Sequence, residues 1–313
     1  MHLKFFKTIL KHVLLYICII FLAGFFIPAT PKAKKSHLYS RYQKEKLFKL
    51  KNKNRIILVG GSNLAFGINS KKIHDSLNLF PINTSIGAGL GLDFMMNDVI
   101  EKIQKNDIVL LVPEYHHFFK DFAFGECNNG EELARMVIDV DKTALINIDK
   151  IQIKYILKYL PVLSLSKFKP NEYFLSDNKN ESNQYNYFGD EIGHWYLPPL
   201  KFNIEKRFNM KELNYNILYK IKIFQRKVKQ IGAKLAISFP CYQESSYNKS
   251  VEEINYIHKL FIKNNFSVIS LPETFKMENQ YMYDTPYHLI KKGVEIRTNH
   301  LIKDLKTYIK RYN

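Results

Sequence analysis

RIILVGGSNLAFG, residues 55–67, contains a short uninterrupted apolar run that ends in two glycines and a serine. Such a run, bounded by turn residues, is typical of a strand buried on both faces of a parallel sheet. The glycines let the backbone turn sharply, which places Ser62 where the following turn points its N–H groups. N–H donors of this kind stabilise an oxyanion by about 3 kcal/mol each in acyl-transfer sites. A phosphate-binding turn or a purely structural turn would carry the same residues.

Further strands and helices alternate along the chain. Three more apolar runs predict strands at residues 107–112, 234–239 and 266–271. Segments with helical spacing precede them at residues 92–103, 215–231 and 251–264, and Gly232 is the expected cap of the second. This alternation predicts βαβ units in an α/β three-layer sandwich with a central, mostly parallel sheet. In such sheets a site lies at the carboxyl ends of the strands, here just after residues 59, 112, 239 and 271.

The alternation fails between about residues 125 and 212, where the chain is rich in Tyr, Asn and Lys. A stretch of this length without helices would be unusual in a compact domain. We therefore interpret it as an insertion that covers the site, with helices expected at residues 131–138 and 150–159. The predicted domain covers residues 55–313 and includes this insertion.

The N-terminus is typical of an export signal. Residues 13–27, VLLYICIIFLAGFFI, are apolar without a break and follow three lysines. Extended back to Thr8, the segment reaches the roughly 20 residues of a membrane-spanning helix. Ile27-Pro28-Ala29 is a poor cleavage site, which favours a retained signal anchor over residues 1–31 with the domain outside the cytoplasm. The alternative is a buried core helix in an intracellular protein.

Positive charge is concentrated beside this segment. The chain carries a net charge of +18, of which residues 1–55 hold thirteen Lys and Arg against the single Glu45. The remaining residues therefore account for only a third of the excess, and they contain no nucleic-acid-binding motif, so no nucleic-acid partner is expected. The basic stretch at residues 32–54 is interpreted as a linker that either faces anionic lipid headgroups or is simply solvated.

Neither a metal nor a cofactor is expected. The three cysteines, Cys18, Cys127 and Cys241, show no metal-ligand spacing, and two unbridged thiols outside the anchor are preferred to a Cys127–Cys241 disulfide. His116 and His117 adjoin Glu114, but neighbouring side chains on an extended segment point to opposite faces. Both histidines are therefore poorly placed to bind one ion.

The C-terminal segment YDTPYHLIKKG, residues 283–293, adds an acid and a base after the last expected strand. Together with the Ser62 turn, it resembles the GDSL/SGNH hydrolase family, in which a serine follows the first strand and a late loop supplies Asp and His. The resemblance implies a three-layer, flavodoxin-like fold. It also implies that Ser62 is the nucleophile, His288 the general base and Asp284 the group that orients the imidazole.

Two further blocks of that family are matched in part. NTSIGAG, residues 83–89, resembles the Asn-led turn that follows the second strand, and Gly89 is preferred to Gly87 as a backbone donor to the oxyanion hole. The third block normally supplies an Asn donor, but the corresponding residues 113–117 are PEYHH. Asn63, Tyr115 or a backbone N–H is the expected replacement. The Asp-to-His spacing is also one residue longer than is usual in the family.

The resemblance covers about half of the chain and is closest to membrane-anchored bacterial proteins that accompany O-acylation of exported polysaccharides and teichoic acids. YFGD, residues 187–190, and His194 are similar to a segment of that branch, although nearby Gly193 favours a loop. The expected function is an extracytoplasmic serine esterase or O-acyltransferase that acts on acyl groups of a cell-surface polysaccharide through an acyl-Ser62 intermediate. Expected partners are the acylated glycan, membrane lipid and a membrane-bound O-acyltransferase. The alternative is a catalytically silent accessory protein.

Overall fold

The computed structural model describes residues 2–50, 54–127, 131–174 and 184–311. Parts of two expected segments, residues 51–53 of the basic linker and residues 128–130 and 175–183 of the insertion, lie outside the described residues. The described chain forms a mixed α/β structure around a parallel four-stranded sheet with the strand order β2-β1-β3-β4. The strands are β1 (Arg55–Gly60), β2 (Phe80–Asn83), β3 (Ile108–Val112) and β4 (Lys234–Ile237).

The two central strands, β1 and β3, are buried along their whole length, as their continuous apolar runs predict. The sequence did not single out β2, which is a short edge strand containing Pro81. Proline is tolerated at that edge because the strand needs partners on one side only. The segment expected as a strand at residues 266–271 runs parallel beside β4, but it is joined to it only by a single bridge, between Val268 and Ile237, with two backbone hydrogen bonds. The segment follows Asn265, which has a positive φ of 57°.

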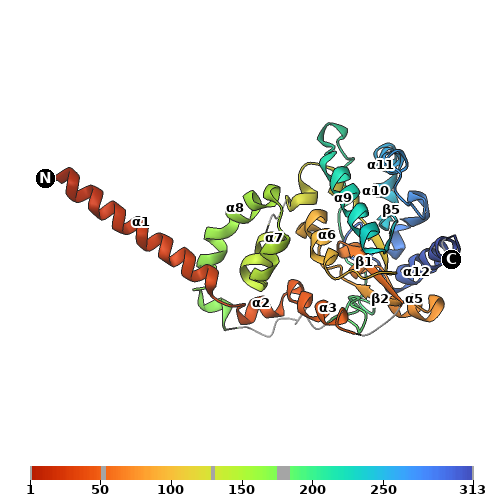
Figure 1. Cartoon of the computed structure of the whole chain (residues 1–313), viewed down its shortest axis with the longest axis horizontal. Coiled ribbons are helices and arrows are strands. Elements are labelled where there is room, and N and C mark those ends of the chain that lie inside the picture. The colour runs from red at the N-terminus through yellow and green to blue at the C-terminus, as the bar shows by residue number, and fades with distance from the viewer. Residues whose placement is uncertain (1, 51–53, 128–130, 175–183, 312–313) are drawn as a thin grey trace.

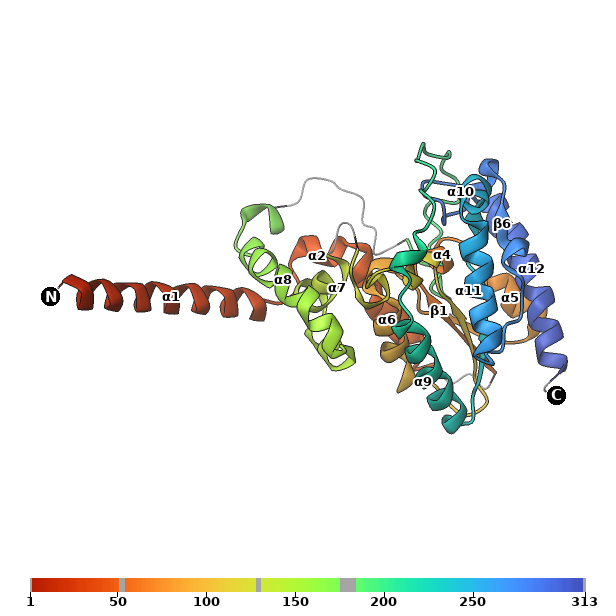
Figure 2. The same ribbon diagram turned by 90° about the horizontal axis from the view of Figure 1, so that it is seen from above.

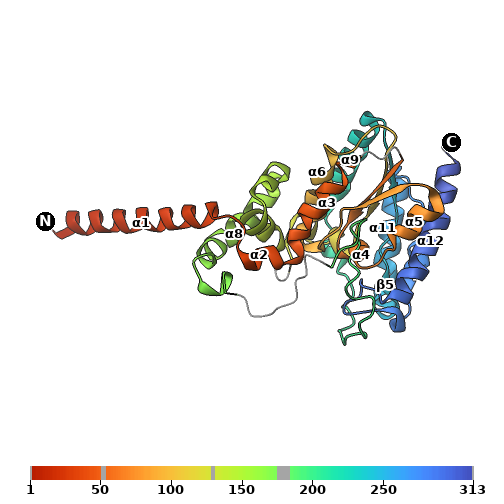
Figure 3. The same cartoon turned by 90° about the horizontal axis from the view of Figure 1, so that it is seen from below.

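Helices lie on both faces of the sheet (Figures 2 and 3). One face carries α3 (Arg41–Leu47), α6 (Leu92–Ile100) and α9 (Asn216–Ile231). The other carries α5 (Ser70–Leu77), α11 (Val251–Lys263) and α12 (Lys291–Lys310). The helices predicted at residues 92–103, 215–231 and 251–264 are confirmed within a few residues. Gly232 caps α9 at a positive φ of 83°, the conformation for which glycine is preferred.

The N-terminal apolar segment forms one long helix, α1 (His2–Phe26), that projects away from the domain (Figure 1). Its apolar side chains are mostly exposed. By length and composition α1 can cross a membrane. The alternative of a buried core helix is therefore not what the structure shows.

The basic segment after α1 is not a free linker. Residues of α2 (Pro31–Lys35) and α3 are helical, and Leu38 and Leu47 are buried against the domain. Arg41 forms ion pairs with Asp98 at 2.6 Å and with Asp141. The segment is largely helical, and the interpretation of its charges as lipid-facing or merely solvated does not hold for Arg41, whose partners in the domain lie far away in the sequence.

Lys44 is one of these cations and is 3% exposed. Its Nζ donates hydrogen bonds to the carbonyl oxygen of Asn83 at 3.0 Å and to that of Gly189. The ammonium also lies 4.5 Å from the centre of the Tyr185 ring. Burial lowers the pKa of Lys44 to about 7, although nearby Asp190 and Glu191 act in the opposite direction.

This low pKa predicts a pH-dependent stability. Between about pH 7 and the ordinary lysine pKa of 10.5, Lys44 is neutral when folded and protonated when unfolded. The unfolded state binds one more proton, so stability rises with pH by about 1.4 kcal/mol per unit in this window. Chemical unfolding of the full chain in detergent measures this effect. Between pH 7 and pH 9 the free energy of unfolding of the unsubstituted chain should rise with pH by this amount relative to that of Lys44→Met. Parallel curves for the two proteins would contradict the prediction.

The insertion contains helices, as predicted: α7 (Glu132–Arg135), which continues into a π-helical turn (Met136–Val140), and α8 (Lys150–Ser166). Its part with α7 and α8 lies between α1 and the sheet (Figure 1). Asp149 caps α8 by accepting a hydrogen bond from the backbone N–H of Ile151. Residues 184–209 consist mainly of turns and irregular chain.

Candidate functional site

Ser62 begins the short helix α4 (Ser62–Ala65) directly after β1, and its side chain is partly exposed. The glycine before it is required by close packing. A Cβ atom on Gly61 would lie 2.6 Å from Glu114 Oε1 and 2.9 Å from Ala88 Cα. Any larger residue would displace the strand end from its neighbours, so the Gly-Gly-Ser order follows from the space at this position.

His288 and Asp284 lie on one tight loop before α12. An antiparallel bridge between Met282 and Leu289 closes the loop, and the Tyr283 N–H donates to the His288 carbonyl at 2.9 Å. Within it, His288 Nδ1 lies 2.7 Å from Asp284 Oδ1. The longer Asp-to-His spacing therefore still allows the carboxylate to meet the imidazole. With Nδ1 engaged, Nε2 is the nitrogen left to accept a proton.

Phe66 supports the His288 ring from the opposite end of the chain. The two rings stack with centroids 4.1 Å apart and an interplanar angle of 6°. Phe66 follows α4 by one residue, so the turn that carries Ser62 also supplies the surface on which the imidazole lies. The two predicted loops therefore meet.

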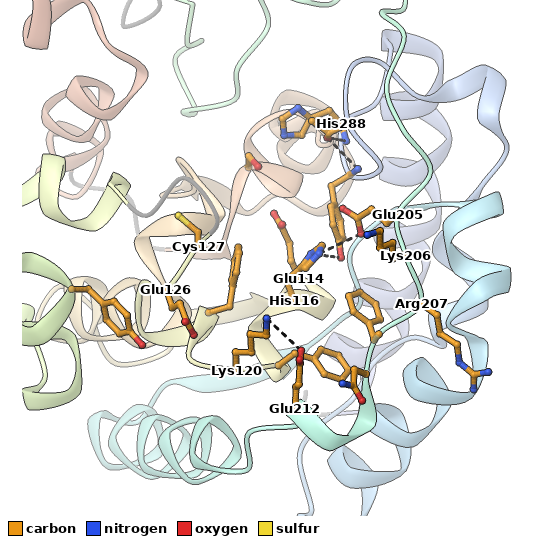
Figure 4. A pocket seen from close by; sticks show the side chains of 18 of the residues that line it. Glu114, His116, Lys120, Glu126, Cys127, Glu205, Lys206, Arg207, Glu212 and His288 are labelled. Carbon is orange, nitrogen blue, oxygen red and sulfur yellow. Dashed lines mark hydrogen bonds and ion pairs between the residues drawn. The ribbon is translucent and has the colours of Figure 1, made fainter. Parts of the chain in front are cut away.

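Ser62 and His288 both line two cavities. The first, of about 900 Å³, is shown in Figure 4, and the second, of about 650 Å³, also includes Asp284 and Phe66. In the described part of the chain no direct hydrogen bond joins the Ser62 hydroxyl to the imidazole. Apo sites are often this loose, and catalytic hydrogen bonds tighten when substrate binds. The serine and the imidazole therefore border a shared space, without a direct hydrogen bond between them.

Asn63 does not point its amide into that space. Its backbone N–H and its Nδ2 both donate to Glu114 Oε1, at 3.1 and 3.2 Å. The backbone carbonyl oxygen and Oδ1 of Asn63 both accept hydrogen bonds from the buried guanidinium of Arg297. The distance from Arg297 to Oδ1 is 2.9 Å. Asn63 thus connects α12 to the carboxylate at the end of β3, and it is not the free oxyanion donor that the sequence predicted.

Arg297 should therefore matter for stability. Arg297→Met removes a cation that is 2% exposed and leaves both oxygens of Asn63 buried without these donors. We expect a loss of roughly 3 kcal/mol in the free energy of unfolding. Chemical unfolding of the full chain in detergent tests this, with Arg226→Met on the exposed face of α9 as the control. Equal stabilities of the two variants would refute the bracing role.

Glu114 occupies the place where the family has its Asn donor. The carboxyl group is buried, lines the first cavity and adjoins the Ser62 turn. Burial raises the pKa of Glu114 above its ordinary value, although the two hydrogen bonds from Asn63 act to lower it. Along the sequence Glu114 is only a neighbour of His116 and His117 in the PEYHH block, because a side chain at a strand end gives no sign of the distant groups it meets.

The other expected oxyanion donors lie elsewhere. Tyr115 is 1% exposed and packs among aromatic rings, 5.3 Å from the Tyr242 centroid, without lining either cavity. Gly89 lies beside Glu132 and Cys127 and lines neither cavity, whereas Gly87 lines the second. The structure therefore places Gly87, and not Gly89, at the space that Ser62 faces.

The insertion segment with Asp190 and His194 braces the site. Asp190 is buried and accepts from the Ser70 hydroxyl at 2.6 Å and from Asn83 Nδ2 at 2.8 Å. The ring of His194 contacts the Glu191 carboxylate through Nδ1 and the Leu289 carbonyl through Nε2, the latter at 2.9 Å. His194 therefore holds the residue next to His288. Asp190 and His194 have separate partners and do not act as a pair.

A second acid–base pair in the first cavity was not expected from the sequence. His116 Nε2 lies 3.4 Å from Glu205 Oε2, which also accepts a hydrogen bond from the Tyr242 hydroxyl at 2.6 Å (Figure 4). Burial raises the pKa of the Glu205 carboxyl to about 7. Glu205 belongs to the part of the insertion with weak periodicity, so only the folded chain shows that it faces His116.

The cysteines are not bridged, and Cys127 lines the first cavity (Figure 4). Cys241 is buried, and its thiol donates to the Tyr287 carbonyl at 2.8 Å, so it is not bridged to Cys127. Among the described residues no group of three potential metal ligands is present.

Comparison of the chain with models of known protein families and with curated proteins gives no match.

Proposed function

We propose that this chain is a membrane-anchored serine esterase or O-acyltransferase with an SGNH-type three-layer domain outside the cytoplasm. The observation that carries the proposal is that Ser62, which follows the first strand, and the Asp284–His288 pair, from the last loop, line the same cavity of about 650 Å³, and that Ser62 and His288 also both line the first cavity. The length and composition of α1 support the anchor. The motif resemblance supports acyl groups of a cell-surface polysaccharide as substrate.

The chemistry follows from this arrangement. Ser62 Oγ attacks the acyl carbonyl while His288 Nε2 takes the hydroxyl proton, and Asp284 holds the imidazole in the required tautomer. The tetrahedral intermediate collapses to acyl-Ser62, and His288 returns the proton to the departing sugar oxygen. Water or a second sugar hydroxyl then attacks the acyl group through the same base and regenerates Ser62. The backbone N–H groups of Ser62 and Gly87 are the proposed oxyanion donors.

A fluorophosphonate probe tests the proposal, because it forms a stable bond only with an activated serine. The full chain in detergent should be labelled at Ser62, as identified by peptide mass spectrometry. Ser76→Ala on the exposed surface of α5 should be labelled as strongly as the unsubstituted chain. Folded protein that stays unlabelled would count against an active nucleophile.

One observation favours a second candidate, a catalytically silent accessory protein of a polysaccharide acylation system. The Glu114 carboxylate accepts hydrogen bonds from the backbone N–H and from Nδ2 of Asn63, beside the Ser62 turn. If ionised, this carboxylate places negative charge where an oxyanion would form, which opposes acyl transfer. In this candidate the cavities bind glycan or a membrane-bound acyltransferase, and the phosphonate probe does not react although glycan still binds.

A further inference from the structure

α8 carries a row of exposed apolar side chains that the rest of the domain does not cover. Leu157 is 57% exposed, Val162 61% and Phe168, just beyond the helix, 51%. Ile153 and Leu165 on the same helix are exposed to a lesser extent. Apolar patches of this kind on a protein surface mark a contact with another apolar phase or a partner.

The C-terminal half of α8 is packed against the end of α1. A Cβ atom on Gly24 would lie 2.3 Å from the carbonyl oxygen of Ser164, so the two helix backbones approach closely. Lys142 and Lys167 both donate to the carbonyl oxygen of Ile27, at 2.9 and 3.0 Å. Figures 1 and 2 show α8 beside this end of α1.

This contact fixes the depth of α8 relative to the apolar helix. Gly24 is followed by three more apolar residues, which at 1.5 Å per residue extend α1 by about 5 Å. Ser164 therefore lies level with a part of α1 that is still apolar on both sides along the chain. Any bilayer that surrounds α1 up to Ile27 must also meet the exposed side chains of the C-terminal half of α8.

The charges around this face suit an anionic membrane surface. Lys34 and Lys169 are exposed just beyond the ends of α1 and α8. Nearby Glu172 forms an ion pair with Lys32 at 2.9 Å and accepts a hydrogen bond from the Thr30 hydroxyl at 3.0 Å. Interfacial helices combine an apolar face in the lipid with lysines at the headgroups.

We propose that α8 is an interfacial membrane helix whose exposed apolar side chains lie in the same leaflet as the C-terminal end of α1. This inference depends on the proposed membrane anchor. Its occupant is the lipid bilayer, because the apolar face continues directly from α1. α8 also contributes Tyr155, Lys158 and Tyr159 to the first cavity, which Ser62 and His288 also line. The cavity is thereby held next to the membrane surface, where it can receive a membrane-borne acyl donor or glycan.

Tryptophan quenching by brominated lipid tests the proposal. The full chain is reconstituted in vesicles of dibrominated phosphatidylcholine with a minority of phosphatidylglycerol, and fluorescence is compared with that in the unbrominated lipids. The unsubstituted chain, whose single tryptophan is Trp195, gives the baseline. Leu157→Trp and Val162→Trp place reporters on α8, Leu15→Trp marks the middle of α1, and His300→Trp on α12 is the control far from α1 (Figure 2).

The expected result is a loss of fluorescence for Val162→Trp comparable with that for Leu15→Trp, a smaller loss for Leu157→Trp, and none beyond the baseline for His300→Trp. Quenching of Leu15→Trp without quenching of either α8 reporter would overturn the interfacial helix and leave the anchor intact. That outcome would assign the apolar face to a protein partner. An unquenched Leu15→Trp would instead overturn the anchor itself.

Discussion

Ser62→Ala should lower the rate of acyl-ester hydrolysis by roughly 10⁴- to 10⁶-fold, the scale seen when the nucleophile of a serine hydrolase is removed. The effect is large because the covalent intermediate can no longer form and the imidazole of His288 has no hydroxyl to deprotonate. Binding and the backbone donors of the turn remain, so a small residual rate over water is expected.

The measurement is hydrolysis of an acetyl-ester probe by the full chain in detergent. Ser76→Ala, an exposed serine on α5, is the matched control and should keep full activity. Circular dichroism and thermal unfolding should be alike for both variants, since Ser62 is partly exposed and its hydroxyl has no hydrogen-bond partner among the described residues. Turnover by Ser62→Ala equal to that of the control would falsify the proposed mechanism.

Asp284→Asn should reduce kcat by roughly 10²- to 10⁴-fold, with a smaller change in KM. The carboxylate accepts the hydrogen bond from His288 Nδ1 at 2.7 Å, and an amide at that position can present N–H groups that favour the wrong tautomer. Because 31% of the Asp284 side chain is exposed, water can replace part of the lost hydrogen bond to His288. A reduction of roughly 10²-fold would therefore also agree with the prediction.

Steady-state kinetics with the same ester probe would measure this effect. Asp75→Asn on α5 is the control, because its carboxylate is 53% exposed and pairs only with Lys71 four residues away among the described residues. Asp284→Glu should recover part of kcat, since it keeps the acceptor. An unchanged kcat in Asp284→Asn would show that the contact in the folded loop does not orient the base.

The core of the fold was predictable because its signals are local. The runs that became β1 and β3 are apolar at every position, and burial on both faces requires that pattern. The helix that ends at Gly232 was predicted by spacing and by its cap. The edge strand β2 was missed because four residues including Pro81 have no distinctive pattern. Residues 266–271 form only a single bridge to β4, which was not predictable because an apolar run alone cannot show how many residues of a segment pair with its neighbour.

Part of the candidate site was predictable from the sequence and part was not. Ser62 and His288 could be chosen from motif chemistry, since a glycine-flanked serine and a late Asp-to-His loop are recognisable along the chain. The oxyanion donors could not, because hydrogen-bond partners are set by distant groups. Asn63 gives its N–H groups to Glu114, and Arg297, more than 200 residues away, holds its oxygens.

By itself the sequence determined a parallel-sheet domain, an apolar N-terminal helix and the chemical types of a nucleophile, a base and an acid, because burial, periodicity and glycine-rich turns act over a few residues. Only the tertiary structure decided that the Ser62 turn and the His288 loop share cavities, that Phe66 supports the imidazole, and that α8 joins α1 to one cavity wall. These features depend on contacts between residues far apart along the chain. Such contacts follow from how the helices pack on the sheet, and no local pattern encodes them.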